Sequence, residues 1–247
     1  SIYNPDSNGA AELQTAITKA ESFLTSLSSA EVQQAVSDLN EACLKYKTQN
    51  ATPEKPLYLT DFIVNPGFNQ NTPEGWKGIG VISYHEVEFY QRTFNMFQKV
   101  TGLPAGKYIL KAQGFERPKN NDSGSAFRAG TETIFAKFYA KANSFSEKNT
   151  PFNSLYKHNF YGTGSLNGYV NSMASAETIL TNSNLYYDTS VTNILLKQGD
   201  TLTIGARSDF QQNGYWTLFD NFRLEYIGAY DSNDLVEEIT NQITIAN

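Results

Sequence analysis

The strongest constraint on the fold is a segment near the end of the chain, residues 216–226, where apolar residues recur with a period of two. Side chains two positions apart share one face of a β-strand. We therefore expect one face to carry Trp216, Leu218, Asp220, Phe222, Leu224 and Tyr226. A charge buried without partners is very unfavourable, so Asp220 should bind backbone donors, a cation or a neighbouring loop. This strand is typical of a closed β-sandwich.

Other strand-like segments precede it, and each is bounded by turn residues such as those at 65–67. They span residues 57–64, 84–100 with a break near Arg92, 107–115, 131–140, 189–196 and 201–206. No helix of crossover length separates them, which favours antiparallel sheets packed face to face. The predicted fold class is mainly β, an antiparallel jelly-roll β-sandwich over residues 57–228. Residues 172–180 predict a short inserted helix that plugs one end of the sandwich.

Helical periodicity marks both ends of the chain. Residues 1–50 predict a helical hairpin, whose second helix is capped by Ser28 and Glu31. Its apolar stripe consists of Val32, Val36, Leu39, Cys43 and Tyr46. A polar linker over 48–56 leads to the sandwich. A further helix over 229–247 either returns to the hairpin or begins the next module of a longer chain.

Composition excludes several classes of function. The formal charge of −6 and the lack of a Lys/Arg cluster argue against nucleic acid or anionic lipid as partner. No apolar run approaches the roughly 18 residues that span a bilayer, so we expect no membrane insertion by this segment. A single cysteine, Cys43, excludes an internal disulfide framework, and the spacing of the two histidines makes no zinc site.

Several motifs carry a family resemblance over residues 57–228. The stretch Asn65-Pro66-Gly67-Phe68 with Gly75-Trp76, the hairpin over 94–115, and the segments "GDTLTIGAR" and "WTLFDNFRLEYIG" recur in this order. Together they resemble galactose-binding-like jelly-roll carbohydrate-binding modules, of the accessory type in secreted and surface proteins of glycan-foraging gut bacteria. The resemblance implies a noncatalytic glycan-binding module, located outside the cell, on its surface or in the periplasm, and joined to other modules.

The resemblance also bears on cofactors. Many related sandwiches carry Glu directly after the aromatic residue of the first motif, where it holds a structural Ca²⁺ against a carboxylate near the last strand. This chain has Asn69 at that position, and an amide oxygen is a weaker calcium ligand. We expect no cofactor apart from such a structural Ca²⁺, for which Asn69 and Asp220 are the candidate ligands.

Catalysis has little support in the sequence. A glycoside hydrolase needs two carboxylates roughly 5 to 10 Å apart. Glu86 and Glu88 are about 7 Å apart by strand rise, but the alternation with Val87 and Phe89 places them on a solvated outer face. No nucleophile elbow, Walker loop or dinucleotide fingerprint occurs. We interpret the chain as not an enzyme, with a hydrolase kept as a minor alternative.

Sugar recognition needs an aromatic ring to stack on a pyranose and planar polar groups to bind its hydroxyls. The candidate ligand-binding residues are Arg117, Asn213, Tyr215, Trp216 and Trp76. The first four come together if the strand ending near 117 and the strand starting at 216 meet at one edge. Core packing is the competing interpretation for both tryptophans. The alternative function is a structural spacer or protein-interaction domain of a larger surface protein.

Overall fold

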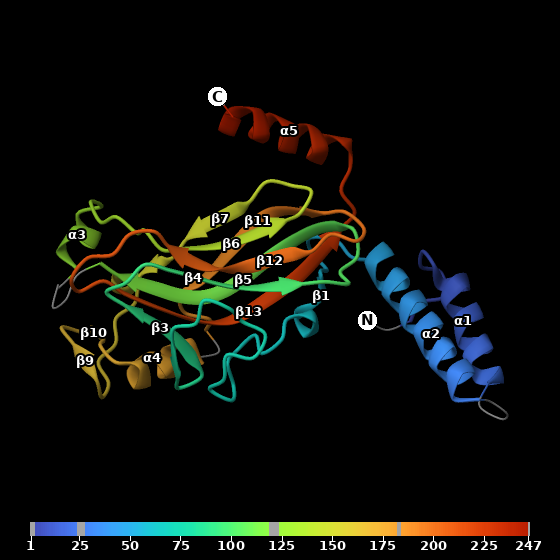
Figure 1. Ribbon diagram of the computed structural model, residues 1–247, viewed down its shortest axis with the longest axis horizontal. Helices are drawn as coiled ribbons and strands as arrows, with labels where there is room; N and C mark the ends of the chain where they lie inside the picture. The colour runs from blue at the N-terminus through green and yellow to red at the C-terminus, as the bar shows by residue number, and fades with distance from the viewer. Residues whose placement is uncertain (1–2, 24–27, 119–123, 182–183, 247) are drawn as a thin grey trace.

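The computed structural model describes residues 3–23, 28–118, 124–181 and 184–246. Its body consists of two sheets packed face to face (Figure 1). The strands of the larger sheet are β1 (Leu57–Tyr58), β2 (Val81–Ser83), β3 (Glu86–Tyr90), β5 (Gly106–Arg117), β8 (Asn153–Ser154), β11 (Asp188–Leu196) and β13 (Trp216–Gly228). Those of the smaller sheet are β4 (Phe94–Val100), β6 (Lys137–Ala142), β7 (Lys148–Pro151) and β12 (Leu202–Ser208).

The order of the strands confirms the predicted mainly β sandwich. The larger sheet runs β11-β5-β13-β3-β2, with β1 beside β13 and β8 beside β5, and the smaller runs β4-β12-β6-β7. All pairs are antiparallel except β5 with β8. Two predicted strands are shorter than expected: after Tyr58 the chain forms a 3₁₀ helix, η1 (Thr60–Phe62), and β6 starts only at Lys137.

The main core lies between the two sheets and is rich in aromatic rings. Phe89 stacks on Phe94, and Phe138 on Phe152, each with ring centroids 4.0 Å apart. Val87 and Phe89 face this core, as their alternation predicts. Because such rings bury large apolar areas, they dominate the stabilisation of the sandwich.

A β-bulge in β13 overturns the prediction that its even-numbered residues share one face. Asp220 pairs with Gln113 of β5, but the next pair joins Arg223 to Lys111, so β13 carries one extra residue. Asn221, between them, has a φ of 56°. An extra residue reverses the side-chain alternation. Consequently Phe222 and the even-numbered residues after it pack into the main core, while those before it face outward.

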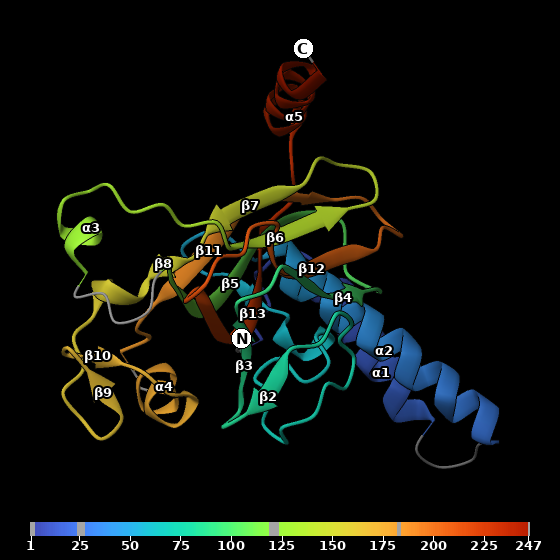
Figure 2. The same ribbon diagram turned by 60° about the vertical axis from the view of Figure 1, so that its left-hand side comes forward.

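The outward-facing half of β13 is covered by residues 153–181 and 184–187 (Figure 2). This segment contains η2 (Leu155–Lys157), β9 (Ser165–Leu166), β10 (Tyr169–Val170) and α4 (Met173–Leu180). A second apolar cluster forms beneath it, in which Trp216 and Leu218 contact Tyr187 and α4 residues. The predicted helix is therefore present, capped by Ser172, but it covers the outer face of the larger sheet and does not plug an end.

The helices at the two ends of the chain lie apart. α1 (Ala10–Ser22) and α2 (Ser29–Gln49) form the predicted hairpin, with the Ser28–Glu31 capping box in place. Val32 and Val36 are exposed, so their assignment to the contact stripe is wrong; Leu13 and Tyr46 make the buried contact. The remaining helices are α3 (Ser125–Arg128) and α5 (Ser232–Ala246).

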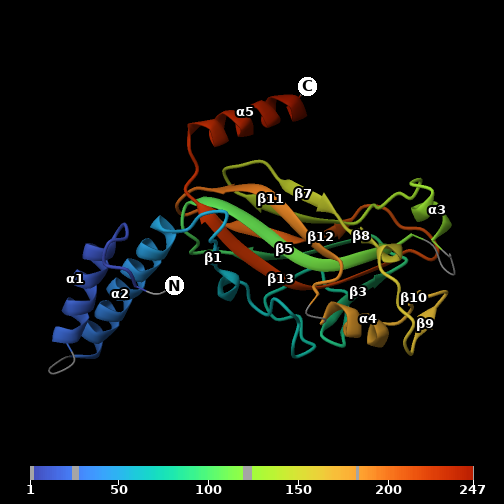
Figure 3. The ribbon, with the colours of Figure 1, turned by 180° about the vertical axis from the view of Figure 1, so that it is seen from behind.

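α5 does not return to the hairpin but lies over the β7 side of the sandwich (Figures 1 and 3). Glu238 anchors it, because its carboxylate binds Lys148 Nζ at 2.6 Å and accepts from the main-chain NH of Ser146 at 2.5 Å. In the described part of the chain, no helix combines the length and the apolar character that a membrane span requires.

Candidate functional site

The two strand ends that were predicted to meet lie side by side at one end of the larger sheet. Trp216, the first residue of β13, pairs with Arg117 of β5 on one side and Tyr90 of β3 on the other. The chain leaves these strands in the β3–β4, β5–β6 and β12–β13 loops. Residues 119–123 of the second loop lie outside the described residues.

Trp216 and Arg117 are buried at this end of the larger sheet. The Arg117 guanidinium carbon lies 4.7 Å from the centre of the Trp216 ring, a cation–π contact. Trp216 Nε1 donates to Glu88 Oε1 at 2.7 Å, and Arg117 Nη1 donates to Asn171 Oδ1 at 2.6 Å. Their exposed fractions are 3% and 7%, so the indole ring does not offer a free stacking surface.

An aromatic surface lies on the loops at this end of the sheet, next to Trp216 and Arg117. We call it the loop-end patch, and it consists of Tyr90, Gln91, Phe135, Phe210, Asn213 and Tyr215. Phe135 and Phe210 stack with centroids 4.0 Å apart, and the Tyr215 ring lies edge-on to Phe210 at 5.3 Å. Phe210 is 37% exposed and Tyr90 is 42% exposed. The patch thus presents aromatic rings to solvent.

Gln91 ties the polar members of the patch together. Its main-chain NH donates to the Tyr215 carbonyl at 2.9 Å. Its side-chain amide donates to Tyr90 Oη at 3.0 Å and to Asn213 Oδ1. Two loops that are distant in sequence therefore hold an amide pair beside two tyrosine rings.

A buried carboxyl group positions the Phe135 ring. Glu116 Oε2 accepts from the main-chain NH groups of Phe135 and Ala136, at 2.7 and 3.0 Å. Burial raises the pKa of Glu116 to about 7, although the two NH groups act to lower it. Burial, with Glu116 nearby, also raises the pKa of Tyr215. The sequence analysis selected Asn213 and Tyr215 but missed Phe135 and Phe210, whose rings meet only through tertiary folding.

Trp76 lies in the main core, away from the patch. Its ring packs against Phe68 and Phe222, with centroids 5.4 and 4.7 Å away, and its Nε1 donates to the Asn65 carbonyl at 3.1 Å. It is 4% exposed. This placement matches the core-packing interpretation of Trp76.

The two candidate Ca²⁺ ligands differ in exposure. Asn69 is exposed and its amide lies beside Gly67, whereas Asp220 is buried on the α4 side of the larger sheet. Across the described ranges, no group of three or more His, Cys, Asp or Glu side chains is arranged to hold a metal.

The two carboxylates considered for hydrolysis differ in their surroundings. Glu86 is 1% exposed, so its assignment to a solvated face is wrong, because the segment that contains α4 covers that face. Glu88 accepts the Trp216 indole NH.

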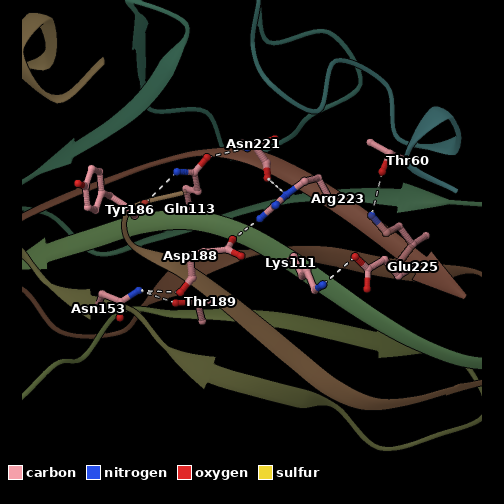
Figure 4. Close-up of polar contacts among 11 residues, drawn as sticks. Thr60, Lys111, Gln113, Asn153, Tyr186, Asp188, Thr189, Asn221, Arg223 and Glu225 are labelled. Atoms are coloured by element: carbon pink, nitrogen blue, oxygen red, sulfur yellow. Dashed lines mark hydrogen bonds and ion pairs between the residues drawn. The ribbon is translucent and has the colours of Figure 1, made fainter. Parts of the chain in front are cut away.

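A polar network crosses the same sheet (Figure 4). Asn221 Nδ2 donates to Gln113 Oε1 at 2.6 Å, Lys111 Nζ binds Glu225 Oε1 at 2.7 Å, and Arg223 binds Asp188. The charges neutralise one another within the network. We interpret this face as structural, since its charged groups are paired.

A hollow of about 310 Å³ lies between α4 and the loop after η2. Its lining consists of His158, Asn159, Phe160, Thr178, Ile179 and Tyr186. The His158 and Tyr186 rings have centroids 4.7 Å apart. This second aromatic surface was not among the sequence predictions, because its members come from segments far apart in the chain.

Comparison with known proteins yields likeness of fold only. No family model matches the chain, and no curated protein matches it. Among solved structures, the carbohydrate-binding module TmCBM61 in complex with β-1,4-galactotriose is 13% identical with a TM-score of 0.36; the match covers 66% of this chain and 96% of that one.

Two further structures align over a similar span of this chain. The mosquito-larvicidal Cry4Aa toxin from Bacillus thuringiensis is 9% identical, with a TM-score of 0.32, over 63% of this chain and 21% of the toxin. The arabinose-bound α-L-arabinofuranosidase MgGH51 is 11% identical, with a TM-score of 0.30, over 66% of this chain and 26% of the enzyme. Likenesses this distant do not identify a ligand, so the functional argument rests on the loop-end patch.

Proposed function

We propose that this chain is a noncatalytic glycan-binding module whose ligand lies on the loop-end patch. The observation that carries the proposal is the exposed ring of Phe210 beside Tyr215, next to the amide pair of Gln91 and Asn213. Aromatic faces stack on the apolar side of a pyranose, and planar amides bind neighbouring hydroxyls. The patch combines both kinds of group on three loops.

The support beneath the patch favours binding at low entropic cost. Tyr215 is held through its carbonyl by the Gln91 NH, and Phe135 through its NH by Glu116. Trp216 and Arg117 pack directly below. A surface already ordered before the ligand arrives loses less conformational freedom on binding.

The noncatalytic assignment is supported by the state of the carboxyl groups near the patch. Glu116 accepts two main-chain NH groups and Glu88 accepts the Trp216 indole NH, so both have structural partners. A retaining or inverting glycosidase needs two carboxyl groups facing the scissile bond. A position outside the cell and attachment to other modules belong to the same proposal and rest on the family resemblance.

Isothermal titration calorimetry tests the proposal, after a glycan array has selected a plant, host or bacterial polysaccharide. Phe210→Ala and Tyr215→Ala should each weaken binding at least about tenfold, as expected for loss of one stacking contact, while the thermal midpoint changes little. Tyr58→Ala, which removes an exposed tyrosine from β1 at the other end of β13, is the matched control. If none of the glycans on the array binds, the proposal is wrong.

The second hollow provides a direct alternative location. Tyr186→Ala should leave affinity unchanged if the ligand binds the loop-end patch. If Tyr186→Ala abolishes binding while Phe210→Ala does not, the glycan site is the hollow between α4 and the η2 loop.

A spacer or protein-interaction role is the second candidate function. The observation that favours it is the exposed apolar side of α5, where Val236, Ile239 and Ile243 face solvent. Sedimentation of the chain alone and with neighbouring modules of its parent protein tests this role. Association that Ile239→Asp removes, in a protein that binds no glycan, would establish it in place of sugar recognition.

A further inference from the structure

A buried carboxyl group of β5 holds the segment that carries one ring of the loop-end patch. Glu116 is 1% exposed, and its Oε2 accepts from the main-chain NH groups of Phe135 and Ala136, at 2.7 and 3.0 Å. The Phe135 ring stacks on Phe210, with centroids 4.0 Å apart, and lies 6.0 Å from the Tyr215 ring. One carboxylate oxygen therefore fixes the segment against which the exposed Phe210 ring packs.

The surroundings of Glu116 leave its charge dependent on those two NH groups. The neighbouring strands pair it with Thr217 of β13 and Ser154 of β8, whose hydroxyls do not titrate. The titratable groups that interact with it are Glu132, before β6, and Tyr215, before β13. In the described part of the chain, no lysine or arginine forms an ion pair with Glu116. Its negative charge is therefore stabilised by main-chain donors.

The Glu116 carboxyl group exchanges its proton close to neutral pH. Burial raises the pKa of Glu116 from its ordinary value, 4.5, to about 7, against the two NH groups, which lower it, and the charge of Glu132 raises it further. Burial also raises the pKa of Tyr215 above its ordinary value, 10, so Tyr215 stays neutral below pH 9. Across the neutral range, the group that holds Phe135 thus changes from a neutral acid to a carboxylate.

The two protonation states hold Phe135 with different strength. A hydrogen bond to an ionised oxygen is roughly twice as strong as one to a neutral oxygen. If the Phe135 segment moved away, an ionised carboxylate would lose its donors, which costs more than leaving a neutral acid unpaired. The cost of burying the charge falls on the fold as a whole, whereas the two NH groups belong to one segment. Ionisation of Glu116 therefore fixes Phe135, and protonation loosens it.

We propose that Glu116 is a positioning residue of the loop-end patch, and that its protonation state sets the affinity of the patch for glycan. The inference rests on the proposed function and adds a regulation to it. Ionised Glu116 keeps Phe135 against Phe210, so the aromatic surface is ordered before the ligand arrives. Because Glu116 is already buried, a ligand on the exposed rings adds little to its desolvation. The order of Phe135 thus decides the sign, and affinity falls as the pH falls.

Nuclear magnetic resonance of ¹⁵N-labelled protein without glycan tests the positioning step. The Phe135 and Ala136 amide signals should shift together with a midpoint near pH 7. Glu116→Gln, which mimics the protonated acid, should abolish this transition. Glu132→Gln should move the midpoint to lower pH, and Glu54→Gln, in the exposed linker, should leave it unchanged. If the two amides do not titrate, or still titrate in Glu116→Gln, the proposal is wrong.

Calorimetry with the polysaccharide that the array selects then measures affinity at pH 5.5 and pH 8.5. The wild type should bind about fivefold more weakly at pH 5.5, whereas Glu116→Gln should bind equally at both pH values, with the weaker affinity. Binding that Phe210→Ala weakens but that does not change with pH would overturn the proposal and leave glycan recognition in place. If no glycan binds at either pH, the proposed function is wrong and its regulation falls with it, while the amide titration still decides whether Glu116 positions Phe135.

Discussion

The Trp216 indole NH donates to the Glu88 carboxylate across neighbouring strands, with the Arg117 guanidinium on the indole face. This contact joins β3, β5 and β13 at the end where their loops carry the loop-end patch. It explains why the chain has a tryptophan at the start of its last strand: the ring supports the patch from below.

Trp216→Ala should destabilise the protein by about 3–5 kcal/mol, the usual cost of truncating a large buried aromatic side chain. Trp216→Phe keeps most of the volume but removes the donor to Glu88, which should cost about 1–3 kcal/mol. Urea unfolding followed by tyrosine fluorescence or circular dichroism measures both. A Trp216→Ala protein as stable as the wild type that only loses glycan binding would show that the ring is a ligand platform.

Asn221→Val should destabilise the protein by about 1–2 kcal/mol, because a β-branched residue does not tolerate the left-handed backbone of the bulge. Asn221→Gly is the control: it accepts this conformation and loses only the hydrogen bond to Gln113. Thermal unfolding of the two variants compares them. Equal stability would mean that β13 pairs without the bulge in solution.

Acid should release α5 from the sandwich. Burial acts to raise the pKa of Glu238, but hydrogen bonds from Lys148 and Ser146 outweigh it and lower the pKa to about 2. A lowered pKa stabilises docking above the ordinary value, about 4.5, and this stability disappears as the pH falls toward 2.

Limited proteolysis near residue 230 at pH 3 and pH 7 measures this release. The Glu238→Gln variant should be cut near residue 230 already at pH 7, where the wild type is protected. Glu237→Gln, at the exposed neighbouring position, should remain protected. Equal protection of Glu238→Gln and wild type would show that the anchor contributes nothing.

Stability should fall as the pH rises from about 5 to 9. The pKa of Glu86 is raised to about 10 and that of Asp220 to about 8, so the folded state holds protons that the unfolded state has released. Stability is full below the unfolded pKa values and is lost as the pH approaches the folded values. Urea unfolding midpoints measured across this pH range give the change of stability with pH. The Glu86→Gln variant should show a smaller change than the wild type.

Much of the sandwich could be predicted because alternation is a local property of the chain. The strands around 86–90, 94–100 and 106–117 follow a period of two, β13 does so on each side of its bulge, and the Ser28 and Ser172 caps mark helix starts. The short strands β2, β7 and β8 were missed because segments this short carry too little pattern.

The candidate site was predicted only in part. Arg117 and Trp216 do meet at one strand end, next to Tyr215, but their burial follows from the segment that contains η2 and α4, which folds over that face. Phe135 and Phe210 come from two different loops, and neither loop sequence indicates that the two rings meet. A sequence pattern cannot show which distant segment covers a face.

By itself, the sequence determined that two apolar layers would form, because each strand's own alternation dictates which of its residues avoid water. Only the tertiary structure decided which layer each half of β13 joins, since a single extra residue at Asn221 reverses the alternation midway. That reversal leaves Asp220 on the outer face of the larger sheet, opposite Glu86, where the segment that contains α4 covers both residues.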